Sequence, residues 1–270
     1  MEIFTIWVRW SFCLLLLQVV LGTCNNVVKT PMAYVPNYGR PDIFITFKCN
    51  PKWLDISDAL FPGQKPEDRH DIVSRVFHLK VKKMMDFLIK FKVFGRVQCH
   101  MGSLEWQKRG LPHIHILVWL TEKISPHQVD SFISAEIPKK DEDPILYDII
   151  TKSMIHGPCG TLNPNSVCMK EGKCSKKFPR SFVSETQTGE DGYPTYRRRS
   201  PEEGGEKFAL KLKSGTMCEI DNRWVVPYCP LLSRIFNAHI NVEYCHSVKS
   251  IKYVCKYVNK GSDQAGNFPR

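Results

Sequence analysis

The chain has 270 residues, of which 43% are hydrophobic and 24% charged; these values are ordinary for a globular protein and set it apart from disordered and fibrous chains. Lys and Arg number 38 against 27 Asp and Glu, so the formal net charge is +11. Such an excess favours a polyanionic partner such as nucleic acid, because phosphate neutralisation supplies most sequence-independent affinity, but charge alone does not identify the partner.

Residues 1–24 differ from the rest of the chain. Arg9 precedes an apolar run over residues 11–21, and small or polar residues follow, which is the layout of a secretory signal peptide. The run is too short for a membrane span, so no stable membrane partner is expected. This signal-like segment has two interpretations, a gene-model artefact joined to a transposon fragment or genuine secretion. The 11 cysteines are odd in number and lack paired spacing, which favours reduced thiols and weighs against secretion.

A strand, a long helix and a second strand are predicted next. Residues 42–49 alternate between two sides, and Asn50-Pro51 ends this strand. After Pro66, apolar residues recur at helical spacing, and the pattern stops by Gly95. Residues 94–106 then form the next strand.

The stretch 112–120 alternates strictly with a period of two. His113 and His115 therefore lie on one face of a half-buried strand, together with Leu117 and Trp119. Successive residues on one face are about 6 to 7 Å apart, so both imidazole rings can converge on one ion. The alternative interpretation is that the two histidines merely occupy positions on a strand and bind no metal ion.

A polar turn over residues 107–110 predicts a hairpin whose first arm ends near Glu105. Glu105 would then be close to cross-strand register with His113, which places a carboxylate beside two imidazoles. Such a face suits Mg²⁺, Mn²⁺ or another divalent ion that must also hold substrate oxygens. Glu105 is a geometric inference, and His100 or Gln107 could replace it as the third ligand.

Helices are predicted over residues 126–135 and 145–155, and a Cys-rich and basic insertion over 156–222 follows. One His and three Cys could hold a tetrahedral structural zinc in this loop: His156, Cys159, Cys168 and Cys174. The intervals are wider than in the common Cys-x-x-Cys knuckles. Free thiols in a basic loop are therefore the alternative.

Cations and aromatic residues mix in the rest of the insertion. The cations proposed to bind nucleic acid are Lys176, Lys177, Arg180, Arg197, Arg198 and Arg199, and Phe178, Phe182, Tyr193 and Tyr196 lie between them. This mixture suits single strands, because bases stack on rings and cations follow the backbone. For any single residue in this group, the alternative to nucleic-acid binding is a place on a solvent-exposed hairpin of the insertion.

The chain then predicts a strand at 223–226, a short helix at 231–236, a strand at 238–244 and a last helix at 250–261. Without the insertion, the order is strand, helix, strand, strand, helix, strand, helix. This order predicts an α+β fold in which helices cover one face of an antiparallel sheet, of ferredoxin-like type.

Tyr253 and Tyr257 stand one turn apart on one face of the last predicted helix. A phenol is a poor nucleophile at neutral pH because its pKa is about 10. A catalytic tyrosine therefore needs a metal that makes its target electrophilic and cations that favour the phenolate. Lys256 is a candidate for that charge stabilisation, and an ordinary surface lysine is the alternative.

The segments GLPHIHILVWL and KYVCKYVNKG resemble the Helitron helicase-like N-terminal domain, the replication initiator of rolling-circle transposases in the HUH endonuclease superfamily. Further matching text, including DIFITFKCNPKW and AHINVEYC, extends the resemblance over about residues 41–263 and leaves 264–270 as a tail. The family implies a divalent-metal nuclease in which a tyrosine becomes joined to the 5′ phosphate of nicked DNA. His113 and His115 match the paired metal histidines, and Tyr253 and Tyr257 match the nucleophiles.

The resemblance implies nicking and joining of single-stranded or melted DNA in the nucleus, with Mg or Mn as cofactor. No Gly-x-x-x-x-Gly-Lys-Ser/Thr loop occurs, so the helicase is expected from another chain or is missing from this fragment. One alternative is an inactive transposon-derived remnant that binds nucleic acid without catalysis. Another is a secreted protein with no DNA role, which the N-terminal run alone supports.

Overall fold

A computed structural model describes residues 20–22, 38–107, 110–188, 194–212 and 215–245. The strands are β1 (Val20–Gly22), β2 (Ile43–Lys48), β3 (Val97–Trp106), β4 (Pro112–Leu120), β5 (Met169–Lys170), β6 (Lys173–Cys174), β7 (Gln187–Thr188), β8 (Pro194–Thr195), β9 (Lys207–Lys211), β10 (Met217–Asp221) and β11 (Ile240–Tyr244). The α-helices are α2 (Leu54–Ser57), α3 (His70–Ile89), α4 (Val129–Phe132), α5 (Pro144–Ser153) and α6 (Pro230–Phe236). Short 3₁₀ helices are η2 (Pro66–Asp68), η3 (Pro126–Gln128), η4 (Pro201–Glu203) and η5 (Asn222–Trp224).

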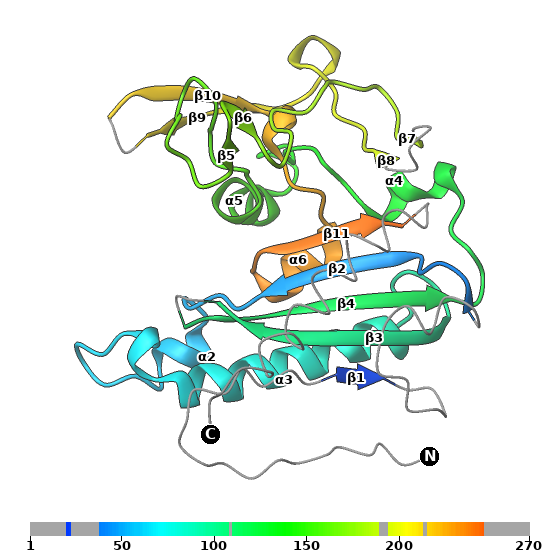
Figure 1. Cartoon of the computed structure of the whole chain (residues 1–270), viewed down its shortest axis with the longest axis vertical. Coiled ribbons are helices and arrows are strands. Elements are labelled where there is room, and N and C mark those ends of the chain that lie inside the picture. The colour runs from blue at the N-terminus through cyan, green and yellow to red at the C-terminus, as the bar shows by residue number, and fades with distance from the viewer. Residues whose placement is uncertain (1–19, 23–37, 108–109, 189–193, 213–214, 246–270) are drawn as a thin grey trace.

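The main sheet has five antiparallel strands in the order β1-β3-β4-β2-β11 (Figure 1). Chain order runs from β2 through α3 to the β3–β4 hairpin, and then through α6 to β11. Apart from β1, this order and strand arrangement are those of a ferredoxin-like sheet. The predicted α+β fold with an antiparallel sheet is confirmed.

Helices α3 and α6 cover one face of this sheet. The buried side chains of α3 recur at helical spacing: Val73, Val76, Phe77, Val81, Met84 and Leu88. They pack with Leu232 and Phe236 of α6 against alternate residues of the central strands, among them Ile45 and Ile116. Most of the buried apolar residues of the main sheet lie on this face. Burying each such side chain stabilises the folded state by about 1.5–3 kcal/mol.

The opposite face of the sheet carries His113 and His115 and is called the histidine face below. Leu117 and Trp119 of β4 pack there with Phe44 of β2 and Met101 of β3. All of β4 is buried, so the prediction of a half-buried strand is wrong. The reason is that β4 lies between two other strands and both of its faces are covered, whereas alternation of side chains alone does not show which face meets water.

Two other predicted elements differ from the structure. The helix predicted over 126–135 ends at Phe132, because Ser134 pairs in an antiparallel bridge with Tyr228. The first two residues of the strand predicted over 223–226 belong to the 3₁₀ helix η5, because the Asp221 side chain accepts a hydrogen bond from the Arg223 N–H and turns the chain. Val225 forms only an isolated antiparallel bridge with Ile155. The last predicted helix, 250–261, lies outside the described residues.

Residues 137–228 form smaller cores beside the sheet. Helix α5 packs against Val225 and Tyr228. A second cluster joins Cys159, Cys168 and Trp224 with side chains of β9 and β10. Figure 1 shows α5 and the β5–β6 and β9–β10 hairpins stacked beyond β11. Within the described ranges, none of the helices has the length and apolar character that crossing a membrane requires.

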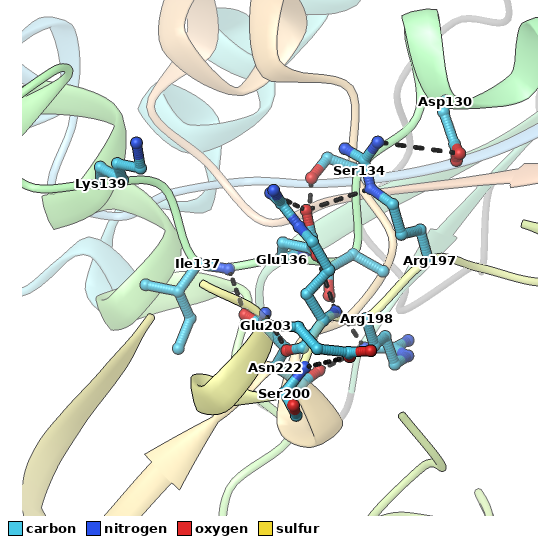
Figure 2. Close-up of polar contacts among 12 residues, drawn as sticks. Asp130, Ser134, Glu136, Ile137, Lys139, Arg197, Arg198, Ser200, Glu203 and Asn222 are labelled. Carbon is cyan, nitrogen blue, oxygen red and sulfur yellow. Dashed lines mark hydrogen bonds and ion pairs between the residues drawn. The ribbon is translucent and has the colours of Figure 1, made fainter. Parts of the chain in front are cut away.

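Glu136 links the segment after α4 to the basic run 197–199 (Figure 2). Its carboxylate accepts hydrogen bonds from the Arg199 Nε at 2.9 Å and the Arg199 Nη2 at 2.7 Å, and from the Arg197 Nε at 3.3 Å. Burial raises the pKa of Glu136, but the hydrogen bonds from Arg199 outweigh it and hold the pKa below its usual value. The buried carboxylate is thus paired with two guanidinium groups.

Arg198 lies between these two arginines and points the other way. It is 3% exposed, and its Nη1 donates to the carbonyl oxygens of Ala135, Asn222 and Val225. Burial lowers the pKa of this guanidinium to about 9, so it stays charged at neutral pH. Arg198 therefore ties three backbone segments together.

Glu136→Gln should lower the free energy of unfolding by about 2 kcal/mol, because charge-assisted hydrogen bonds in a buried site are lost. Glu142→Gln is the matched control, since Glu142 pairs with Lys139 at the exposed surface, where a salt bridge contributes only about 0–1 kcal/mol. Urea denaturation measures both. Equal effects of the two substitutions would show that the Glu136 pairing does not stabilise this region.

Candidate functional site

The register of three neighbouring strands places the candidate ligands in two rows on the histidine face. His113 of β4 lies opposite Glu105 of β3 on one side and Lys48 of β2 on the other. In the next row, His115 lies between Ser103 and Thr46. Directly opposed residues of antiparallel strands project from the same face, so the rows form one polar patch.

Glu105, His113 and His115, called the histidine cluster below, have ligand atoms within 4.8 Å of one another. The Nε2 atoms of His113 and His115 are 3.1 Å apart, and the Glu105 Oε2 lies 3.3 Å from the His113 Nε2. The Thr46 Oγ1 contacts the His115 Nδ1 at 3.0 Å, and Phe44 stacks on the His115 ring. These contacts fix the ring so that its Nε2 faces His113.

Both histidines are neutral at physiological pH. Burial, with a smaller contribution from the charge of Lys48, lowers the pKa of His113 to about 4. Burial, followed by His113 and Lys48, lowers the pKa of His115 to about 3. Neutral imidazole is the form that binds a metal ion.

The histidine cluster fits a divalent ion. One ligand atom from each residue lies within 4.8 Å of the others. Two ligands bound at about 2.1 Å and at right angles on one ion are about 3 Å apart. The contacts of 3.1 and 3.3 Å agree with that spacing. Two imidazoles and a carboxylate, half-open to solvent through Glu105, are a ligand set for first-row divalent ions.

Of the alternatives named for the third ligand, His100 lies on the other face of the sheet. His100 pairs with Val118, so its side chain projects from the helix-covered face and cannot reach the histidine cluster. Gln107 follows the end of β3, in the turn that leads to β4. Glu105 is the acidic residue that the strand register places beside His113, as the hairpin predicted.

A second group of ligands, called the cysteine cluster below, consists of His156, Cys159, Cys168 and Cys174. One ligand atom from each lies within 4.8 Å of the others, and the Cys174 Sγ is 3.5 Å from the His156 Nε2. Phe178 stacks on the His156 ring at a centroid distance of 4.3 Å and so orients it. Three thiols and one imidazole that lie this close together could hold a metal ion.

The thiols of the cysteine cluster differ in acidity. Burial, with hydrogen bonds from Cys174 and Cys168, raises the pKa of Cys159 to about 12. Burial also raises the pKa of Cys174, but backbone hydrogen bonds from Phe178 and Lys176 outweigh it and lower the pKa.

The predicted nucleic-acid-binding cations divide into two groups. Lys176, Lys177 and Arg180 are exposed on the loop that follows Cys174. Arg197 and Arg199 are held by Glu136, and Arg198 is buried by carbonyl contacts. Arg198 is therefore not accessible to DNA, whereas contact of the partly exposed Arg197 and Arg199 with DNA stays a prediction.

Tyr253, Tyr257 and Lys256 lie outside the described residues, as does the signal-like segment up to residue 19. Residues 20–22 form β1, whose backbone pairs with β3 at the edge of the sheet. The arrangement of the tyrosines relative to the histidine cluster therefore stays a prediction.

Sequence analysis missed Lys48 and Thr46, which face the two histidines from β2. The alternation over residues 42–49 places both on the side opposite Ile43, Ile45 and Phe47, so their shared face could be predicted. Their position beside β4 could not, because β2 and β4 are neighbours only through the crossover by α3.

A family model described as the Helitron helicase-like domain at the N-terminus matches residues 23–118. This span holds β2, α3, β3 and most of β4, and with them the whole histidine cluster. The family resemblance predicted from the sequence is confirmed here, and it implies an interaction with nucleic acid. A comparison with curated proteins finds no match to the chain.

The metal-free protein should become less stable as the pH falls from about 6.5 towards 4. Because the folded-state pKa values of His113 and His115 lie near 4 and 3, the unfolded chain takes up protons first, and stability present above pH 6.5 is lost on acidification. Each histidine should contribute about 3 kcal/mol over this range. Urea denaturation at a series of pH values measures the slope.

His115→Gln should make this pH dependence shallower, whereas His127→Gln, at an exposed position, should leave it unchanged. Identical slopes for wild type and His115→Gln would show that His115 is not held neutral by burial.

Proposed function

Since residues 23–118 match the Helitron helicase-like domain, we propose that this chain nicks and joins single-stranded or locally melted DNA through a phosphotyrosine intermediate, as in rolling-circle transposition. The observation that carries the proposal is the histidine cluster, which lies on two adjacent strands inside the matched span. The net charge of +11 and the exposed cations beside the cysteine cluster support a nucleic-acid substrate.

Glu105, His113 and His115 would hold the divalent ion, for which the mixture of carboxylate and imidazole suits Mn²⁺ or Mg²⁺. A bound ion would supply positive charge that polarises the scissile phosphate and offsets the charge of the transition state. The hydrogen bond between Thr46 and His115 orients the ring, as the partner of a metal-binding imidazole usually does.

Tyr253 or Tyr257 would act as the nucleophile. The phenolic oxygen forms a bond to phosphorus, the bond between phosphorus and the 3′ oxygen breaks, and the phenolic proton ends on that oxygen as the 3′ hydroxyl. The 5′ phosphate stays joined to tyrosine, so the reverse attack by a 3′ hydroxyl rejoins the strand without a nucleotide cofactor. Lys256, four residues after Lys252 and beside both tyrosines in the sequence, would favour the phenolate.

The chain after β11 is long enough to bring a tyrosine to the histidine cluster. Strand β11 ends at Tyr244, opposite Ile43, at the far end of β2 from Lys48. That end is about 17 Å from the Lys48 end, and the nine residues from 244 to 253 span up to about 30 Å when extended. Cys245, the last residue before this segment, packs with Trp119 on the histidine face.

We propose further that the cysteine cluster holds a structural Zn²⁺, since three thiols and one imidazole are the ligands that zinc prefers. The cluster joins loop segments around residues 156–178 that contain only two-residue strands. A metal there would supply folding energy that so few backbone contacts do not.

His113→Ala and Tyr253→Phe should each lower the formation of a covalent adduct with a labelled oligonucleotide in Mn²⁺ by at least about 100-fold, because one removes a ligand and the other the nucleophilic oxygen. A denaturing gel detects the adduct as a shifted protein band. His127→Ala and Tyr147→Phe are the matched controls at positions away from the histidine cluster and should retain the adduct. Unchanged adduct in both test variants contradicts the mechanism, and DNA binding without any adduct would identify an inactive remnant.

Purified protein should contain one tightly bound zinc, and Cys168→Ser should release it and lower the unfolding temperature, because one of four ligands is lost. Elemental analysis and thermal unfolding measure the two effects. Cys229→Ser, at a buried free thiol outside the cysteine cluster, should keep the zinc. A metal-free wild-type protein with the same unfolding temperature after chelation would rule out the structural role.

A further inference from the structure

Three neighbouring strands place a row of polar side chains beside His115. Thr46 of β2 lies directly opposite His115 of β4, and Asn241 of β11 lies directly opposite Thr46. Paired residues of antiparallel strands project from the same face, with Cβ atoms about 4.5–5.5 Å apart. Glu243, two residues after Asn241 on β11, projects from this face as well. The histidine face thus continues from the candidate metal ligands onto β11.

Glu243 fixes the orientation of the Asn241 side-chain amide. The Asn241 Nδ2 donates to the Glu243 Oε1 at 2.8 Å. Because an ionised carboxylate only accepts hydrogen bonds, the amide nitrogen must be the atom that faces it. The other atom of the amide, Asn241 Oδ1, is buried and has no hydrogen-bond partner in the described part of the chain. An unpaired buried acceptor costs about 1–3 kcal/mol, so a donor on the same face would stabilise it.

The contact between Thr46 and His115 has two possible directions. The Thr46 Oγ1 lies 3.0 Å from the His115 Nδ1, and either group can donate. If Thr46 donates, the hydrogen of the neutral ring is on Nε2, which faces His113 and then cannot bind a metal ion. If His115 donates from Nδ1, its Nε2 keeps a free lone pair. The hydroxyl hydrogen of Thr46 then needs another acceptor.

Asn241 can supply that acceptor. Thr46 is 8% exposed, so water competes little for its hydrogen. Accepting a hydrogen bond from Thr46 would use an Asn241 oxygen that no other described group occupies. Every hydrogen bond in the row would then run in one direction, from His115 to Thr46, to Asn241 and to Glu243. The bond from Thr46 to Asn241 is the member of this row that the described contacts do not already include.

We propose that this row of hydrogen bonds holds His115 with its hydrogen on Nδ1, so that Nε2 is ready to bind the metal ion. Thr46, Asn241 and Glu243 are then positioning residues, because they act through His115. A carboxylate at the end of the row makes the imidazole a stronger ligand, as direct carboxylate partners of metal-binding histidines do. Because the metal ion belongs to the proposed function, this role rests on that function.

Nitrogen NMR of protein labelled in its histidine rings shows which ring nitrogen bears the hydrogen. Wild-type protein without added metal should hold His115 with the hydrogen on Nδ1. Asn241→Leu should move part of the population to the Nε2 form, because the Thr46 hydrogen loses its acceptor. Loss of signals in His115→Gln identifies the resonances of this ring.

The affinity for Mn²⁺, measured by electron paramagnetic resonance of the free ion, tests the same row at the metal. Thr46→Val should weaken binding about 10- to 100-fold, as loss of an outer partner of a metal-binding histidine does. Thr46→Ser keeps the hydroxyl and should bind like the wild type. Asn241→Leu should weaken binding about 5-fold, the effect of one hydrogen bond, and no further once Thr46→Val is present. Thr195→Val, at an exposed position in β8, is the matched control and should keep the wild-type affinity.

Hydrogen on the His115 Nε2 in the wild-type protein, or an unchanged hydrogen position in Asn241→Leu, would overturn the proposal. So would equal losses of affinity from Asn241→Leu with and without Thr46→Val, since a residue that only stabilises the strand acts independently of the hydroxyl. Urea denaturation checks that each variant is folded. If Thr46→Val does not fold, the hydrogen position in the wild type and in Asn241→Leu still decides.

These outcomes are separate from those of the proposed function, because neither the hydrogen position nor Mn²⁺ affinity requires cleavage. Wild-type protein that forms no covalent adduct, but shows the expected hydrogen position and the expected effects of Thr46→Val and Asn241→Leu, would refute the nicking activity alone. Adduct formation by a protein whose His115 bears its hydrogen on Nε2 would refute the row of hydrogen bonds alone.

Discussion

The antiparallel register of β4 between β3 and β2 is the constraint on which the candidate site depends. It places His113 opposite both Glu105 and Lys48, and His115 opposite Thr46. A slip of one residue would turn every side chain of β4 to the other face and move both histidines into the helix-covered core. The apolar residues that alternate with the histidines, which pack under α3 and α6, resist that slip. The core that stabilises the fold thus also fixes the ligand geometry.

Burial gives this site its chemical state. The apolar neighbours Leu117 and Trp119 remove water from the histidine face, and the pKa values of His113 and His115 fall far below neutrality. A charged imidazole would compete with a metal ion, whereas a neutral one binds it without first losing a proton. The cysteine cluster differs, since loops bring its ligands together and no extended sheet supports them. The sheet would position the ligands of the histidine cluster, whereas a metal in the cysteine cluster would itself stabilise the loops that supply its ligands.

Local patterns allowed the sequence to predict the hairpin that pairs Glu105 with His113 and the gathering of His156 with three cysteines. Period-two alternation and turn residues predict the hairpin, and the preference of metal ions for thiol and imidazole ligands suggests the group of His156 and the cysteines. Contacts between distant segments escaped prediction. The sequence pattern predicts that Arg198 is an exposed cation like its neighbours. In the structure its guanidinium donates to the carbonyl oxygens of Ala135, Asn222 and Val225. None of these three residues is near Arg198 in the sequence. The position of Lys48 beside His113 likewise depends on the α3 crossover, which brings β2 next to β4.

The most direct measurement of the central claim is a crystal structure of the protein soaked in Mn²⁺, with anomalous diffraction recorded at the manganese edge. We expect one anomalous peak within about 2.1–2.3 Å of the Glu105 carboxylate and of the Nε2 atoms of His113 and His115. A fully soaked crystal with no peak at these three residues, or with manganese bound only elsewhere, would contradict the metal centre and the nicking activity proposed from it.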